Sequence, residues 1–292
     1  MKRFDIVRRR RIWFSLSLLI SLAGIIAMFV MGLNLGTDFK AGTRVQVELG
    51  SGFDTQAVRN AFASIHLQPD RVTVAGATGD TAVVRLAEKI TPQQEAEINK
   101  VIKEKFPQAK GLQVTSVDPI VAKELSQKAV YAVLAAAVGI ILYMSIRFEY
   151  RFAISGVISL LQVVLFVVSV FALLQVEIDL TFIAALLTIV GYSIHDTIVI
   201  FDRIRENLKH RKIKTVKDLE DLVNDSLWQT MRRSINTVVT VVISAGLLYI
   251  LGGPSIRNFS FALLIGLVFG AWSSIFIASQ IWVSWRKRGL KA

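Results

Sequence analysis

Six apolar stretches are each long enough to cross a lipid bilayer, and they constrain the fold of this chain more than any other feature. About 20 residues of α-helix span roughly 30 Å of hydrocarbon. The stretches are residues 12–33, 129–146, 152–174, 180–201, 234–251 and 259–285. With 53% hydrophobic and 19% charged residues, the chain is also far more apolar than a soluble protein of its size. We therefore predict an α-helical membrane protein with six transmembrane helices.

The first stretch follows the basic sequence "MKRFDIVRRRR", so it has the outline of a secretory signal. Its apolar core is longer than the roughly 7–15 residues of a signal peptide, and "GLNLGTDF" after it offers no small-residue cleavage site. We interpret residues 12–33 as a membrane anchor that is not removed.

Lysine and arginine residues collect at alternate ends of the predicted helices, which predicts the orientation of the chain. Arg8–Arg11 precede the first helix, Arg147 and Arg151 join the second to the third, and "RKRGLKA" ends the chain. The opposite connections, "QVEID" and "GGPSIRN", hold a single arginine between them. We expect both terminal segments, 1–11 and 286–292, to be cytoplasmic in a multi-pass membrane protein.

The net charge of +12 is explained by this asymmetry, because the sequence shows none of the motifs typical of nucleic-acid binding. The absence of cysteine excludes disulfides, thiolate metal sites and cysteine nucleophiles. We therefore expect no nucleic-acid partner and no metal site.

Only residues 34–128 form a connection long enough to fold by itself. "TRVQVEL" alternates as a half-buried strand does, "DTQAVRNAFASI" and "TPQQEAEINKVIKEKF" are amphipathic helices with capping residues, and "RVTVAG" and "TAVVRLA" flank the turn "ATGD". With a last strand in "LQVTSVDPI", the order is βαββαβ, which predicts a small α+β ferredoxin-like domain. We expect it outside the cytoplasm, between helices 1 and 2, with helices 2–6 following in residues 129–285.

Asp196 lies inside the fourth stretch, six residues before Asp202 and so about 9 Å from it along a helix. A charged carboxylate at such a depth costs about 2.5–3.5 kcal/mol, so it normally faces a partner or water and serves a function. Two other interpretations stay open: Asp196 joins two helices by hydrogen bonds, or the helix ends at Gly191. His195 is a weaker candidate, because its side chain points about 100° away from that of Asp196.

An ionised Asp196 requires a cation, and the nearest candidates are Arg232 and Arg233 in "QTMRRS" at the start of the fifth stretch. Either arginine could instead be an interfacial anchor. An aspartate whose arginine partner comes and goes is a proton switch. Since no P-loop sequence is present, we expect an ion gradient as the energy source, with H⁺ as the coupling ion, Na⁺ as the alternative, and no cofactor.

Small residues recur in the sixth stretch at the spacing of one helical turn. Gly266 and Gly270 are four apart, and Ser273 and Ser274 follow one turn later. Such residues let helix backbones approach closely in lipid, so we predict a helix-packing face here. A sliding interface between moving helices would have the same pattern.

Several of these segments together resemble the SecF family, the smaller membrane subunit of the bacterial protein-export accessory complex. They are "GLNLGTDFKAG", "VGYSIHDTIVIFDRIREN", "QTMRRS" and "GGPSIRNFSFALLIGLVFGAWSSIFIAS". The resemblance implies half of an RND-type twelve-helix unit, completed by SecD. It also implies proton-driven assistance to a polypeptide emerging from a SecY-type channel, with proton-transfer roles for Asp196 and Arg233.

The chain departs from the family pattern at three positions. Ala41 replaces a glycine of the family's paired-glycine motif, so we expect residue 41 not to adopt a positive φ. His195 stands where relatives often have asparagine, and Arg232 adds a charge beside the expected arginine. The additional arginine leaves open whether Arg232 or Arg233 pairs with Asp196.

The sequence favours this role over three other functions. A small-molecule or lipid exporter of the RND type needs a larger substrate-enclosing domain than residues 34–128 provide. An intramembrane aspartyl protease needs two carboxylates at depth, and only Asp196 qualifies. A passive scaffold would be indifferent to Asp196→Asn. We therefore expect a transport subunit and no enzyme.

Overall fold

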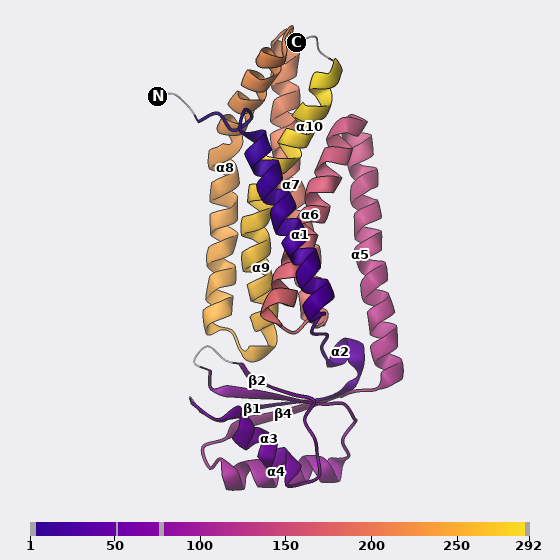
Figure 1. Cartoon of the computed structure of the whole chain (residues 1–292), viewed down its shortest axis with the longest axis vertical. Helices are drawn as coiled ribbons and strands as arrows, with labels where there is room; N and C mark the ends of the chain where they lie inside the picture. The colour runs from indigo at the N-terminus through magenta and orange to yellow at the C-terminus, as the bar shows by residue number, and fades with distance from the viewer. Residues whose placement is uncertain (1–3, 51, 76–78, 290–292) are drawn as a thin grey trace.

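The computed structural model describes residues 4–50, 52–75 and 79–289, so parts of the predicted terminal segments and of the predicted "ATGD" turn lie outside the described residues. Within these ranges, six helices are long and apolar enough to cross a membrane, which confirms the predicted number of spans. The first five are α1 (Arg10–Met31), α5 (Pro119–Arg147), α6 (Tyr150–Leu174), α7 (Leu180–His210) and α8 (Val216–Leu251). The start of α1 and the end of the last helix lie at one end of the bundle, and the sheet lies at the other (Figure 1).

The sixth span is not one regular helix. It consists of α9 (Pro254–Ser273), the π-helical turn η1 (Ser274–Ala278), α10 (Ser279–Arg286) and the short 3₁₀ turn η2 (Lys287–Gly289). The sequence predicted an uninterrupted helix over residues 259–285, because a π-helical turn has the same apolar composition as the helix around it. Such turns occur mostly as single insertions at functional sites.

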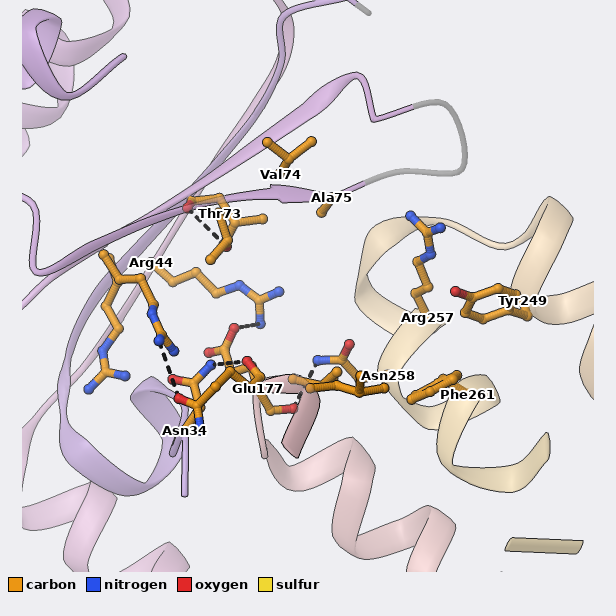
Figure 2. Close-up of a pocket in the computed structure, with 16 residues that line it drawn as sticks. Asn34, Arg44, Thr73, Val74, Ala75, Glu177, Tyr249, Arg257, Asn258 and Phe261 are labelled. Carbon is orange, nitrogen blue, oxygen red and sulfur yellow. Dashed lines mark hydrogen bonds and ion pairs between the residues drawn. The ribbon is translucent and has the colours of Figure 1, made fainter. Parts of the chain in front are cut away.

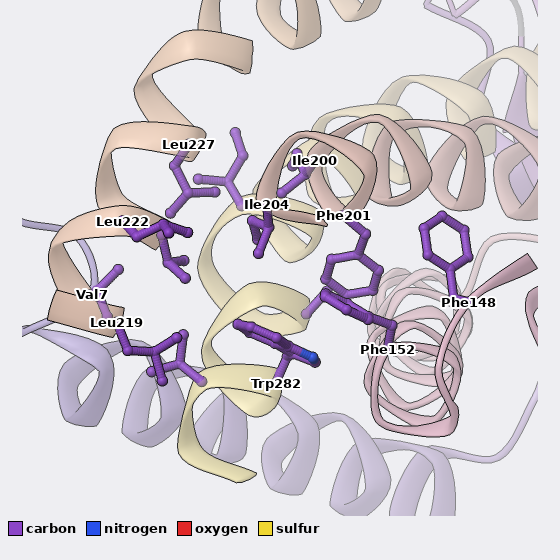
Figure 3. Packing of buried hydrophobic residues seen from close by; sticks show 14 of the residues in the cluster. Val7, Phe148, Phe152, Ile200, Phe201, Ile204, Leu219, Leu222, Leu227 and Trp282 are labelled. Atoms are coloured by element: carbon purple, nitrogen blue, oxygen red, sulfur yellow. The ribbon is translucent and has the colours of Figure 1, made fainter. Parts of the chain in front are cut away.

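The helix α8 is twice as long as its uncharged stretch, since it begins at Val216 and the stretch at residue 234. Thr215 and Asp218 form a capping box that fixes its start. The first half of α8 is amphipathic, with charged residues on one side. Its other side buries Leu219 and Leu222 against Trp282 and neighbouring apolar residues (Figure 3). A search of the sequence for uncharged stretches therefore finds only the second half of α8.

The small domain has the predicted βαββαβ order. Its strands are β1 (Gly42–Glu48), β2 (Arg71–Ala75), β3 (Thr81–Leu86) and β4 (Lys110–Val117), and they form an antiparallel sheet in the order β2-β3-β1-β4. The helices α3 (Thr55–Ala63) and α4 (Pro92–Lys105) cover one face, with Val45, Val84, Phe62 and Ile98 in the core between them. The fold class is therefore a six-helix membrane protein with one small ferredoxin-like domain.

The connection between α6 and α7 attaches this domain to the bundle. Leu35 and Ile178 form an isolated parallel bridge, in which Gly36 N donates to Ile178 O at 2.8 Å and Ile178 N donates to Asn34 O at 2.8 Å. Asn258, near the start of α9, donates to the carbonyl of Glu177 at 3.1 Å. The second face of the sheet consequently lies toward the ends of the membrane helices.

The expectation for Ala41 was wrong. Ala41 has φ 63° and ψ 176°, at the end of the one-turn helix α2 (Thr37–Lys40). The turn is held because Ala41 N donates to Thr37 O at 3.0 Å and the neighbouring Gly42, with φ 109°, has no room for a side chain beside the carbonyl of Leu86. The surroundings therefore impose on alanine a conformation that glycine adopts without strain.

An Ala41→Gly variant should be more stable than the parent by about 1–2 kcal/mol, because glycine removes the strain of a positive φ. The melting temperature of the purified chain in detergent measures this. Ala63→Gly is the matched control: Ala63 ends the regular helix α3, so the same exchange there should cost up to about 1 kcal/mol. A lower melting temperature for Ala41→Gly would contradict the argument.

Candidate functional site

Asp196 lies in the middle of the 31-residue helix α7, at the point where α7 packs against α8 and α9. The helix continues without interruption from Leu180 to His210, so the interpretation in which it ends at Gly191 is wrong. Asp196 is half-buried, whereas Asp202 is nearer the surface and forms ion pairs with Arg147 at 3.2 Å and Arg205 at 2.7 Å. Asp196 is therefore the deepest carboxylate of α7, and it is the one that forms no ion pair among the described residues.

One oxygen of Asp196 has a partner in the bundle. Ser234 of α8 donates its hydroxyl to Asp196 Oδ1 at 2.5 Å. The other oxygen, Oδ2, is buried and has no hydrogen-bond partner in the described part of the chain. An unsatisfied buried acceptor costs about 1–3 kcal/mol, and more when it is charged. Oδ2 therefore has the capacity for one further hydrogen bond.

A cavity of about 20 Å³ adjoins Asp196. His195, Thr237, Gly266 and Gly270 contribute to its walls, which come from α7, α8 and α9. The cavity therefore has room for one water molecule beside the carboxyl group.

Arg232 and Arg233 do not contact Asp196 in this structure. Both are exposed on α8, and neither takes part in an ion pair among the described residues, so Ser234 occupies the position on Asp196 that we expected for arginine. Arg233 is nevertheless the residue next to Ser234 in the chain. A rotation of α8 by one residue, about 100°, would turn the guanidinium toward the carboxyl group.

Ser234 was missed by the sequence reasoning. A single serine in a transmembrane helix is common, and nothing in "RRSIN" shows which residue faces α7. The signal becomes visible only from the buried face of α8, where Ser226, Thr230 and Ser234 follow one another at intervals of four residues and are all buried.

His195 points away from the Ser234 contact. Its side chain is exposed, borders the small cavity, and also lines an apolar groove of about 490 Å³ between α5 and α7. It makes no hydrogen bond or ion pair within the described ranges. The structure thus places His195 beside the site, on a face of the bundle that this chain does not cover.

The four small residues of the sixth span face α6 and α7. A side chain at Gly266 would overlap Ile189, and one at Gly270 would press on Ser193. Ser273 shares a 2.8 Å hydrogen bond with Ser159 of α6, and Ser274 shares one of 2.8 Å with Thr197 of α7. Ser193 and Thr197, which flank Asp196, are thus fixed against α9 and η1, while the carboxyl group itself contacts Ser234 of α8.

The chain matches two family descriptions. Residues 97–288 match "Protein export membrane protein SecD/SecF, C-terminal", and residues 26–51 match "SecD/SecF GG Motif". The protein translocase subunit SecF of Alicyclobacillus acidocaldarius is 57% identical over 292 residues, with 99% of this chain and 95% of that protein covered. The protein translocase subunit SecDF of Bacillus subtilis is 46% identical over 290 residues, covering 99% of this chain and 39% of the relative.

Two solved structures share the fold. The crystal structure of SecDF from Thermus thermophilus, a translocon-associated membrane protein, matches with a TM-score of 0.89 at 30% identity and covers 98% of this chain and 39% of that one. SecDF in its super-membrane-facing form matches with a TM-score of 0.69 at 28% identity, covering 99% of this chain and 39% of that one. The chain thus spans less than half the length of a SecDF protein.

Proposed function

Because the chain belongs to the SecD/SecF family and resembles SecF subunits over its whole length, we propose that it works with SecD as a proton-driven auxiliary subunit of protein export. The family membership supports a multi-pass inner-membrane protein with a role in export. The names of the relatives favour this role over that of a small-molecule or lipid exporter. The proton drive is our inference from the site.

SecD is the proposed partner. In the Bacillus subtilis and Thermus thermophilus proteins a single SecDF chain contains a part that matches this chain, and this part is 39% of the whole. A separate SecD chain would supply the remainder. The exposed face of α7 at His195 and the groove beside it suit such a neighbour, because they lie at the depth of the proton site.

We propose that the bundle end with the termini is cytoplasmic and that the sheet domain lies outside. Basic residues support this orientation, since Arg10, Arg147, Arg205 and Arg286 all lie at the terminal end of the bundle. The sheet domain would then meet the polypeptide that emerges from a SecY-type channel, and hold or pull it.

The observation that carries the proton drive is the half-satisfied carboxyl group of Asp196 inside the bundle. When it is ionised, Ser234 and, after a rotation of α8, Arg233 stabilise it. When it binds a proton from outside, the attraction to Arg233 is lost and α8 is free to return. Each proton that crosses 100 mV supplies about 2.3 kcal/mol for this movement.

Reconstitution tests the proposal. Membrane vesicles that lack their own SecF should regain gradient-stimulated export of a preprotein when this chain and its SecD partner are supplied together, and the two chains should copurify. The matched control is the same pair with this chain omitted. Export that stays independent of the proton gradient in the presence of both chains would contradict the proton drive. Failure to copurify would contradict the partnership.

A further inference from the structure

A cavity of about 530 Å³ lies between the second face of the sheet and the ends of α6, α8 and α9 (Figure 2). Its size is that of a pocket for a small molecule. It is some distance from Asp196 along the bundle, since it borders the last residue of α6 and the first turns of α9. The proton mechanism makes no use of it.

Three arginines form a row across the sheet at this cavity. Arg44 of β1 pairs in register with Arg85 of β3, and Arg85 pairs with Arg71 of β2. Residues directly opposite on adjacent strands share a face, and Val84 next to Arg85 is in the core with the helices, so the row lies on the face toward the membrane helices. Like charges opposite one another destabilise a sheet. The row consequently requires negative charge from elsewhere.

The chain's own carboxylates compensate two of these arginines. Arg44 lies 3.8 Å from Glu177 and 4.0 Å from Asp179, and Arg85 lies 3.8 Å from Asp70. Burial raises the pKa of the Glu177 carboxyl group above its ordinary value, although the Arg44 guanidinium opposes this. Burial therefore makes the ionised form of Glu177, which faces Arg44, less stable than it would be in water.

Arg71 lacks such a partner. It donates to the neutral Gln175 Oε1 at 3.3 Å and has no ion pair among the described residues. Arg257 of α9 adds a fourth guanidinium to the walls, 5.0 Å from the centre of the Tyr249 ring. Four arginines thus line the cavity, and three carboxylates, Glu177, Asp179 and Asp70, lie within 4.0 Å of two of them, so positive charge remains in excess and an anion fits beside Arg71.

The opposite wall of the cavity combines polar residues, among them Gln175 and Asn258, with an apolar part. Leu174, Tyr249 and Phe261 contribute the apolar part from the ends of α6, α8 and α9. These residues lie where the hydrophobic spans end, the level at which lipid headgroups and aromatic side chains meet. A ligand here would be anionic toward the sheet and apolar toward the membrane.

We propose that this cavity binds the headgroup of an anionic phospholipid from the leaflet on the side of the sheet domain. The phosphate is held by Arg71 and Arg257, and the glycerol with the start of the acyl chains lies against Leu174 and Phe261. Arginine suits this task, because its planar guanidinium binds two phosphate oxygens at once. The bound lipid would supply the charge that the arginine row lacks and would connect the sheet domain to the bilayer.

Lipid retention tests the site. The chain, copurified with its SecD partner in neutral detergent, is incubated with phosphatidylglycerol or phosphatidylcholine, and bound lipid is counted by native mass spectrometry. We expect preferential retention of phosphatidylglycerol, weakened roughly fivefold by Arg71→Gln and roughly 25-fold by Arg71→Gln with Arg257→Gln. Lys100→Gln with Lys103→Gln is the matched control, since both lysines are exposed on α4, which covers the other face of the sheet.

Equal retention of phosphatidylglycerol by the double variant and its control would overturn the proposal. So would displacement of the lipid by millimolar inorganic phosphate, which would indicate a site for free anions, or binding of an acidic peptide without any of the lipid. If the double variant has a lower melting temperature than the parent, the test uses the parent protein alone. Phosphatidylglycerol should then raise the melting temperature of the parent more than phosphatidylcholine does. Equal shifts would refute the site. None of these readouts depends on the proton drive.

Discussion

An Asp196→Asn variant is expected to lose the stimulation of preprotein export by the proton gradient, at least tenfold, while still assembling with SecD. Asparagine has the shape of aspartate and can accept the hydrogen bond from Ser234, but it cannot bind or release a proton near neutral pH. Gradient-driven export into vesicles measures the loss. The fold should survive, because the exchange removes a buried charge whose Oδ2 has no partner in the described chain.

Asp202→Asn is the matched control for this variant. It removes a carboxylate from the same helix, six residues away, where the exposed Arg147 and the partly exposed Arg205 pair with it. Surface ion pairs of this kind contribute about 0–1 kcal/mol, so export should change little. Gradient-driven export that persists in Asp196→Asn, or that falls equally in both variants, would contradict a special role for Asp196.

A Ser234→Ala variant should lower gradient-driven export about tenfold. It deletes the donor to Asp196 Oδ1, and the carboxylate then has no hydrogen bond from the described chain. The lost bond to a charged group corresponds to about 1.5–3 kcal/mol. The ionised state becomes harder to form, so release of the proton slows. The same vesicle assay measures the decrease.

Two further serine variants separate this effect from a loss of packing. Ser234→Thr keeps the hydroxyl and should restore most of the export. Ser244→Ala, three turns further along α8, removes an exposed hydroxyl that donates only to Thr240 O at 3.2 Å, and it should leave export unchanged. If Ser234→Ala exports as well as the Ser244→Ala control, the contact with Asp196 has no part in the cycle.

The elements that hydropathy or strand alternation determines were predicted well. Six apolar stretches predicted the six spans, and the alternation in "TRVQVEL" with two capped amphipathic helices predicted the βαββαβ order. These features depend on residues close together in the sequence, so a short window of sequence is enough to predict them. The length of α8 was not predictable in this way, because its first half is buried on one side only.

The features that were missed depend on contacts between distant residues. Whether Ser234 or Arg233 faces Asp196 depends on the rotation of α8 against α7, and a difference of one residue is about 100°. Ala41 adopts a positive φ at the end of α2, where its N–H donates to Thr37 O and the next residue enters β1. The arginine row exists only through the register that joins Arg44 to Arg85.

Proton movement through the reconstituted pair tests the central claim most directly. Liposomes that contain this chain with its SecD partner and a pH-sensitive dye inside are given a proton gradient, and dye response is recorded with and without a translocating preprotein. The parent should pass protons when the preprotein is present, and Asp196→Asn should not, whereas Asp202→Asn should behave as the parent does. Equal proton entry through the parent and Asp196→Asn would show that the coupling proton does not use this carboxyl group.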